Sequence, residues 1–305
     1  MSRQAVFDVL AGIGIVFLQW GFIYGIMSSM GWVTFEGFAW EYDTPGTVLA
    51  GTLLFSVIFM LVGWNEELLS REGNPFWVIN PTLAHIRKLL FDTAYPEWLW
   101  NTILVSVTAT VLSLVCSVLA AYSIERLRFR GSRYVGMAIF LAYLVPPSIL
   151  FIPLAAIIYQ AGLFDTRLAL ILTYPTFLVP FCTWLLMGYF KSIPFELEEC
   201  ALIDGASRLQ ILVKIVLPPA VPGLISAGIF AFTLSWNEFI YALTFVSSSE
   251  VKTVPVAVVT ELVEGDVYHW GSLMAGALLG SLPVAVLYSF FVEHYVSGMT
   301  GAVKE

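Results

Sequence analysis

Long runs of apolar residues, separated by short polar stretches, dominate this chain. The runs cover the following segments: 6–31, 46–64, 98–122, 134–159, 168–190, 219–246 and 271–296. Because a membrane-spanning helix needs about 20 consecutive apolar residues, each run is long enough to cross a bilayer. The pattern predicts an all-α integral membrane protein, a polytopic helical bundle of six core spans preceded by one extra N-terminal span.

The composition supports this class and excludes others. Of the 305 residues 59% are hydrophobic and 12% are charged, whereas an ordinary soluble domain has about 45–50% apolar and about 25% charged residues. So few charges cannot cover the surface of a soluble protein of this length. Lys and Arg number 14 against 22 Asp and Glu, and this acidic balance argues against a nucleic-acid partner.

The cysteines and histidines lack the spacing of a metal site or a disulfide framework. Cys116, Cys182 and Cys200 form no CxxC pair, and the three histidines lie far apart in the sequence. We therefore expect no metal site, and we expect the cysteines to be buried as small apolar side chains.

Positive charge predicts which loops face the cytoplasm. The loop 123–133 carries four arginines: Arg126, Arg128, Arg130 and Arg133. Cytoplasmic loops of cell-membrane proteins are enriched in Lys and Arg, so this loop is predicted to be cytoplasmic. Alternation then places the long segment 191–218 on the same side and the acidic stretch 247–270 outside.

The N-terminal region allows two interpretations. Residues 1–45 are predicted to comprise an apolar helix and an acidic loop, and residues 46–305 the ABC-importer-like membrane domain. The start of the chain has no cleavage pattern typical of a signal peptide, which favours a retained helix. Either this helix is an extra span with an external N-terminus, or one of the first two apolar segments does not cross fully. We favour the extra span.

The segment 191–218 is predicted to form two amphipathic helices on the cytoplasmic side. Pro194 suits the start of the first helix, whose early turns carry acids that complement the helix dipole: Glu196, Glu198 and Glu199. Gly205 can end this helix by adopting a positive φ. The second helix has apolar residues at a spacing of three to four and is expected to end at Pro218 and Pro219.

Lipid or protein could cover the apolar side of these two helices. A helix that lies on anionic lipid is typically rich in Lys and Arg, whereas 191–218 has three cations and four acids. The composition therefore favours docking against another protein.

This segment resembles the EAA motif of the membrane subunits of binding-protein-dependent ABC importers. The matching residues are Glu199-Cys200-Ala201, Asp204-Gly205-Ala206 and Ile215-Val216-Leu217-Pro218, with Cys200 where the motif has Ala. The stretches 120–131, 162–172 and 235–245, and the C-terminal tail, are similar to the maltose-type (MalG-like) carbohydrate permeases. The chain departs from that branch at His294, at Glu305 and in its extra front segment.

The resemblance implies a type I ABC importer permease fold and a transport subunit that is not an enzyme. In such importers this loop forms a coupling helix that docks on a cytoplasmic ATPase dimer. That separate chain would bind ATP and Mg²⁺, and this chain would bind no cofactor. The coupling contact would involve Glu199, Cys200, Ala201, Asp204, Gly205, Ala206, Ile215, Leu217 and Pro218, and the tail residues Thr300, Gly301 and Lys304 would reach the same ATPase.

The function implied is uptake of a sugar or oligosaccharide, delivered by an extracytoplasmic solute-binding protein, by alternating access. A second permease subunit, expected to be a different chain, would complete the pathway. A non-sugar solute such as a glycerol phosphate is the alternative within the family. A self-sufficient secondary transporter is a further alternative; it would need coupling acids and preferably two related halves, but the chain has no evident repeat and the EAA-like segment would be unexplained. A membrane enzyme would need a catalytic or metal cluster, and the sequence shows none.

Helix breakers and polar residues within the spans indicate a solute pathway. Prolines interrupt four successive spans: Pro146, Pro147, Pro153, Pro175, Pro180, Pro222 and Pro283. Membranes tolerate such breaks mainly where the backbone faces protein or a cavity. A static bundle with ordinary kinks is the alternative.

Glu238 is the most conspicuous ionisable residue within a predicted span. A carboxylate facing lipid is costly, so Glu238 is expected to face the bundle interior or a watery cavity. Trp236 and Tyr241, with Asn237 beside them, could stack on sugar rings in a pathway. Alternatively, Glu238 pairs with a partner subunit and the aromatic residues belong to an interface belt.

Overall fold

The computed structural model describes residues 83–264, 267–268 and 270–301. The predicted spans 6–31 and 46–64, and the predicted N-terminal region 1–45, lie outside these residues. The chain divides into two compact units, one of residues 1–93 and 262–278, the other of residues 94–261 and 279–305.

The smaller unit contains a helix, a hairpin and the first turns of a long helix. These elements are α4 (Ala84–Phe91), β1 (Val263–Glu264), β2 (Val267–Tyr268) and the start of α15 (Trp270–Gly301). The two strands are antiparallel, with Val263 opposite Tyr268. This hairpin is the departure from the all-α class, which is otherwise confirmed for the described residues.

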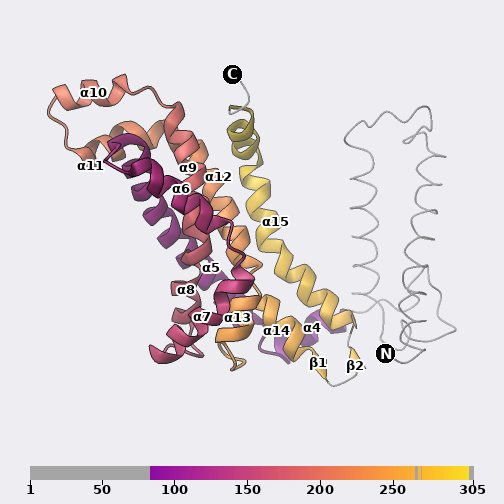
Figure 1. Cartoon of the computed structure of the whole chain (residues 1–305). Helices are drawn as coiled ribbons and strands as arrows, with labels where there is room; N and C mark the ends of the chain where they lie inside the picture. Colours follow the sequence, from indigo (N-terminus) through magenta and orange to yellow (C-terminus); the bar gives the residue numbers. More distant parts are fainter. Residues whose placement is uncertain (1–82, 265–266, 269, 302–305) are drawn as a thin grey trace, which may run out of the picture. The chain divides into compact units, whose positions relative to one another are not determined.

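The larger unit is entirely helical in its described part (Figure 1). Its α-helices are α5 (Tyr95–Tyr122), α6 (Ser132–Tyr143), α7 (Pro147–Gln160), α8 (Arg167–Thr173), α9 (Pro175–Ser192), α10 (Glu196–Ile203), α11 (Arg208–Ile211), α12 (Leu217–Trp236), α13 (Ile240–Phe245), α14 (Val254–Glu261) and the rest of α15. Two π-helical turns, η1 (Ser123–Leu127) and η2 (Leu212–Val216), extend α5 and precede α12.

The described residues contain four continuous helices that are long and apolar enough to cross a membrane. They cover Tyr95–Leu127, Arg167–Ser192, Arg208–Trp236 and Gly271–Tyr288. Helices α6 and α7, bent by 96° relative to each other, give a fifth crossing if the pair forms one span. These five elements overlap the five predicted runs from 98–122 onward.

The sixth predicted span has different ends from those expected. Pro218 and Pro219 do not terminate the preceding helix, because they occupy the first turn of α12, where a proline needs no N–H. The wider π-helical turn η2 leads directly into them. At the other end α12 stops at Trp236, and 240–245 forms the separate helix α13.

A predicted proline break is real at one place in the described spans, where the chain bends sharply before Pro147. At Pro175 only Tyr174 separates α8 from α9, and the two helices form one continuous span, Arg167–Ser192. Pro153, Pro180, Pro222 and Pro283 lie inside helices that continue through them. The expectation that these four also interrupt their spans is wrong.

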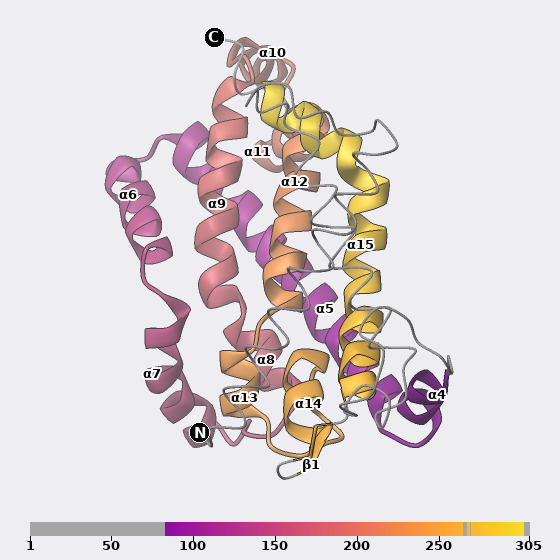
Figure 2. The ribbon, with the colours of Figure 1, turned by 90° about the vertical axis from the view of Figure 1, so that its right-hand side faces the viewer.

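Helices α5, α9 and α12 pack side by side as the centre of the larger unit (Figure 2). The buried side of α5 carries small hydroxyl residues: Thr102, Ser106, Thr110, Ser113 and Ser117. Small side chains let helix backbones approach closely, as is common in membrane bundles. The Ser117 hydroxyl donates to the Val179 carbonyl of α9 at 3.2 Å.

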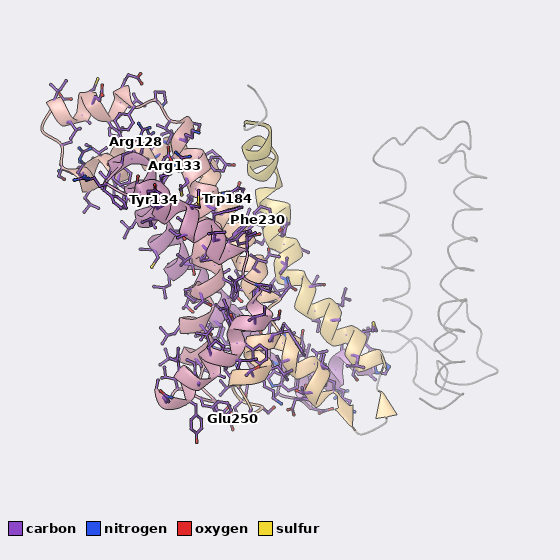
Figure 3. All side chains as sticks on the ribbon, viewed as in Figure 1. Arg128, Arg133, Tyr134, Trp184, Phe230 and Glu250 are labelled. Atoms are coloured by element: carbon purple, nitrogen blue, oxygen red, sulfur yellow. The ribbon has the colours of Figure 1, made fainter. Side chains whose placement is uncertain are left out.

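The two ends of the larger unit carry different elements. Figure 2 shows α10 and α11 at one end, and α7, α8, α13 and α14 at the other. Arg128 and Arg133 lie at the end that carries α10, and Glu250 lies at the opposite end (Figure 3). The predicted cytoplasmic segments 123–133 and 191–218 therefore share one end, as the alternation of spans requires.

Candidate functional site

The loop 191–218 forms a helix–turn–helix whose first helix ends in a left-handed glycine. Gly205 has φ +82°, its N–H donates to Leu202 O at 3.0 Å, and the N–H of Ala206 donates to Ala201 O at 2.9 Å. This pair of hydrogen bonds is the Schellman motif, which satisfies carbonyls at the end of α10. The positive φ predicted for Gly205 is confirmed.

The second helix of this loop begins with a capping box. The Ser207 hydroxyl accepts from the N–H of Gln210 at 3.4 Å, and the Gln210 side chain accepts from the N–H of Ser207 at 2.8 Å. Two otherwise unpaired backbone donors are thereby satisfied. The turn between α10 and α11 is therefore fixed by its own hydrogen bonds on both sides.

The residues predicted to contact an ATPase divide by exposure. Glu199, Cys200, Asp204, Gly205 and Pro218 are exposed; Ala206, Ile215 and Leu217 are half-buried; and Ala201 is buried. Cys116 of α5 is exposed as well, so among the cysteines the expectation of burial holds only for Cys182.

Large apolar side chains are also exposed along this loop. They are Leu197, Leu202, Ile203, Leu209 and Val213, and Ile203 is exposed to 86%. Grouped apolar side chains rimmed by polar ones are typical of a surface that another protein covers. The helix–turn–helix thus has the character of a docking surface.

A buried ion pair joins this loop to the end of α5. Glu198 is fully buried, and its Oε1 lies 3.1 Å from Nε of Arg126 in η1. The Tyr122 hydroxyl donates to Glu198 Oε2 at 3.4 Å, and Arg126 Nη2 donates to the Ile193 carbonyl at 2.6 Å. Both guanidinium groups of Arg126 and Arg128 lie over the Phe195 ring, at 5.3 and 5.4 Å from its centroid.

The contact between Glu198 and Arg126 was not predicted: Glu198 was expected to complement the helix dipole, and Arg126 to mark a cytoplasmic loop. The sequence holds no signal for this contact, because adjacent helix residues can share an exposed side, as Glu196 and Leu197 do here.

Glu238 serves as a cap for α13. Its two carboxylate oxygens accept hydrogen bonds from the N–H groups of Tyr241 at 2.8 Å and Ala242 at 3.0 Å. These donors belong to the first turn of α13, where an acid also complements the helix dipole. In this structure the carboxylate is held by its own chain.

The other three residues predicted near a pathway have distinct surroundings. Trp236 is buried and its Nε1 donates to Gly280 O at 3.0 Å. Tyr241 is fully buried, with its ring 5.4 Å from that of Phe245 between centroids. Asn237 is exposed and donates to Thr233 O at 2.9 Å. In this conformation neither aromatic ring presents an open face to a solute.

Asp165 fixes a loop at the end opposite α10. Its N–H donates to Phe245 O at 2.8 Å, and its Oδ1 accepts from the N–H groups of Ser247 and Ser248 at 2.8 and 2.9 Å. These two backbone donors hold the pKa of the Asp165 carboxyl below its ordinary value. Asp165 also has φ +60°, a conformation that aspartate tolerates better than most residues.

The N-terminal turns of α5 hold the continuation of the same loop. Trp98 Nε1 donates to Ser249 O, and Asn101 Nδ2 donates to both Glu250 O and Lys252 O, at 2.8 and 3.0 Å respectively. Together with Asp165, these side chains fasten the backbone of 247–252.

The predicted tail contact stays untested, since Thr300 and Gly301 are described only as backbone of α15 and Lys304 lies outside the described residues.

The spans and the docking surface at one end define a multi-pass membrane protein that works with partner proteins. Residues 113–301 match the family described as the binding-protein-dependent transport system inner membrane component. The chain belongs to this family. It is a multi-pass permease of the inner membrane, and members of the family are transport subunits rather than enzymes.

Individual relatives and one solved structure agree with this assignment. The chain is 36% identical to the inner membrane ABC transporter permease protein YcjP of Escherichia coli, over 73% of this chain and 80% of the relative. It is 32% identical to the trehalose/maltose transport system permease protein MalG of Thermococcus litoralis, over 85% of this chain and 95% of that relative. A chain of a bacterial ABC transporter involved in alginate import superimposes with a TM-score of 0.69 at 22% identity, covering 86% of this chain and 100% of that one. The last similarity shows the fold.

Proposed function

We propose that this chain is a membrane-spanning permease subunit of an ATP-driven importer that takes up a sugar or oligosaccharide. The observation that carries this proposal is the exposed helix–turn–helix 196–216 at the end of the spans. Its turn is fixed by hydrogen bonds and its surface is typical of one that a protein covers. Family membership supports a role in binding-protein-dependent transport.

The partner for this surface is a cytoplasmic ATPase dimer. The exposed Glu199 and Asp204 supply polar contacts, and the exposed Ile203 and Leu209 supply apolar ones. ATP and Mg²⁺ are bound by the ATPase chain, and the tail residues Thr300, Gly301 and Lys304 lie against it. ATP changes the conformation of the permease only if it binds one state of the ATPase dimer more tightly than the other.

A second permease subunit covers part of the α6–α7 face. Among the described residues of α6 none is buried, and Tyr143, Leu144 and Val145 at the break are all exposed to 38% or more. Irregular backbone at membrane depth does not face lipid, because lipid cannot satisfy its polar groups. The break is therefore expected to face a second subunit or a water-filled pathway between the two.

Four residues at the corner between α12 and α13 are proposed to border this pathway. Asn237 has an exposed side chain and is the one placed to meet solute directly. Trp236, Glu238 and Tyr241 hold the α12–α13 corner in place through the contacts described above. Asn237 is thus proposed to contact the solute, whereas Trp236, Glu238 and Tyr241 are proposed to shape the wall of the pathway.

The solute class follows from the relatives, one of which is named for trehalose and maltose. The test is uptake in proteoliposomes that contain this chain together with its ATPase, second permease and binding protein. We expect ATP-dependent uptake of radiolabelled trehalose, maltose or another sugar in a panel that includes glycerol 3-phosphate. Uptake of glycerol 3-phosphate alone would contradict the sugar assignment, and uptake without the ATPase would contradict the importer assignment.

A further inference from the structure

We propose that the buried Arg126–Glu198 ion pair fastens the coupling helix α10 to α5, so that movement of α10 is transmitted to that span. This inference rests on the proposed function of the loop as the ATPase contact. Arg126 and Glu198 are positioning residues: they touch neither ATP nor solute, and they act by holding two helices together.

The chain itself connects α10 to only two spans. Residues 193–195 join it to α9, and the turn at Gly205, with α11 and η2, joins it to α12. Helix α5 has no covalent link to this loop and lies far from it in the sequence. Helix α5 packs against α9 and α12, so it can follow α10 indirectly through these two spans. A direct link between α5 and α10 needs a side-chain contact.

The ion pair supplies that contact at a fully enclosed joint. The side chains of Arg126 and Glu198 are exposed to only 3% and 1%. Arg126 extends from η1, which continues α5 directly, and it also donates to the Ile193 carbonyl where the chain leaves α9. One guanidinium thus holds the end of α5, the exit from α9 and the first turns of α10.

Two further contacts close the joint. The Tyr122 hydroxyl, one turn before Arg126, donates to the second oxygen of Glu198. The Phe195 ring, immediately before α10, lies under both Arg126 and Arg128, an arrangement that attracts cations to the ring face. Separation of α10 from α5 would leave the buried charges of Arg126 and Glu198 unpaired, which is costly. The two helices are therefore held in one relative position.

Stability alone does not account for this pair. A buried ion pair contributes little net stability compared with well-packed apolar side chains of similar volume. A pair of charges does, however, fix the distance and direction between two elements more narrowly than apolar contact. The pair lies between the docking helix α10 and the span α5, where it can transmit movement of one helix to the other.

Adjacent residues thus have opposite tasks in α10. Glu198 points inward to the spans, and Glu199 is exposed where the ATPase docks. The inference predicts that their removal has different consequences. Loss of Glu199 should weaken ATPase binding, whereas loss of Glu198 should leave the ATPase bound but poorly coupled to transport.

The experiment uses the complete importer in proteoliposomes and measures three quantities: copurified ATPase, binding-protein-stimulated ATP hydrolysis and solute uptake. For Glu198→Gln and Arg126→Gln we expect an assembled complex that still hydrolyses ATP but loses most of its uptake per ATP hydrolysed. Glu97→Gln, at an exposed position of α5 outside the docking surface, is the control and should behave like the unmodified importer.

A double variant, Arg126→Gln with Glu198→Gln, shows whether the two residues act as one unit. If they do, its uptake per ATP equals that of either single variant, whereas independent roles would multiply the two losses. A normal ratio in the single variants, or multiplied losses in the double variant, would overturn the inference.

If a variant complex does not assemble, a more conservative substitution still tests the inference. Should Glu198→Gln not yield a complex, Glu198→Asp keeps the charge but shortens the side chain by one methylene. The inference then requires an assembled complex with reduced uptake per ATP, and an unchanged ratio would overturn it. A different result would contradict the proposed function: the unmodified chain takes up solute in the absence of an ATPase, or it binds no ATPase.

Discussion

The ring of Tyr189 in α9 packs directly on the backbone of Gly223 in α12. A β-carbon at Gly223 would lie 2.3 Å from Cγ of that ring and 2.6 Å from both Cδ atoms. No side chain larger than hydrogen fits there without displacing an aromatic ring. This contact sets how closely two of the three central helices approach.

Replacing Gly223 with alanine is therefore expected to destabilise the protein. Forcing extra volume into a packed helix interface costs about 1–3 kcal/mol, so Gly223→Ala should lower the thermal unfolding temperature of the detergent-solubilised chain. Gly188→Ala in α9 is the control, because no atom of the described residues lies within 4 Å of its β-carbon position. Equal unfolding temperatures for both variants would contradict the close packing of α9 on α12.

Gly205 allows a test of the turn without a steric clash. No described atom lies within 4 Å of its β-carbon position, so the cost of a side chain comes from φ +82° alone. Gly205→Val should strain the turn by about 1–2 kcal/mol, abolish ATP-driven uptake and still reach the membrane in normal amounts. Gly205→Asn, which tolerates this conformation, should retain uptake. Full uptake by the valine variant would argue against a fixed turn.

The Asp165 contact predicts an acid-sensitive loop at the end opposite α10. Its pKa is lower in the folded protein, so the carboxylate stabilises the fold above the ordinary aspartate pKa of about 3.9, and this contribution is lost as pH falls through the folded value. Amide exchange of Ser247 and Ser248, relative to their intrinsic rates, should rise on acidification. In Asp165→Asn the same amides should exchange faster near neutral pH and respond less to acid. An acid response of equal size in both proteins would exclude Asp165 as its source.

Glu238 is expected to matter for the α12–α13 corner rather than for subunit assembly. Glu238→Gln keeps one acceptor oxygen but loses the charge and the second acceptor, which should cost about 1.5–3 kcal/mol, as for hydrogen bonds to a charged group. The thermal unfolding temperature should fall while the yield of assembled complex is retained. The exposed Glu250→Gln provides the control. Collapse of assembly in the Glu238 variant alone would instead indicate a buried cation on a partner subunit.

Features set by local chemistry could be predicted from the sequence. Apolar runs revealed the spans from 98–122 onward, because burial in lipid acts on each helix separately. The end of α10 at Gly205 was predictable for a similar reason, since a left-handed turn depends on one residue and its neighbours. These predictions needed no knowledge of which helices meet.

Features that depend on neighbouring helices could not be predicted. The partner of Glu198 is set by how η1 packs on the loop 191–218, and nothing in the spacing of Arg126 reveals it. Pro218 and Pro219 were misjudged because a proline ends a helix or begins one according to the preceding turn, here π-helical. Likewise the burial of Trp236 and Tyr241 follows from contacts with α15 and with α13 and its neighbours.

Docking of the loop on an ATPase is tested most directly by cross-linking from Ile203, which is exposed to 86% at the end of α10. A photoreactive amino acid at Ile203 in the complete importer is predicted to form a cross-link to the ATPase chain. The same group at Tyr159 of α7, exposed to 75% at the opposite end of the spans, should form none. A cross-link to the ATPase from Tyr159 and none from Ile203 would contradict the assignment of this loop as the coupling site.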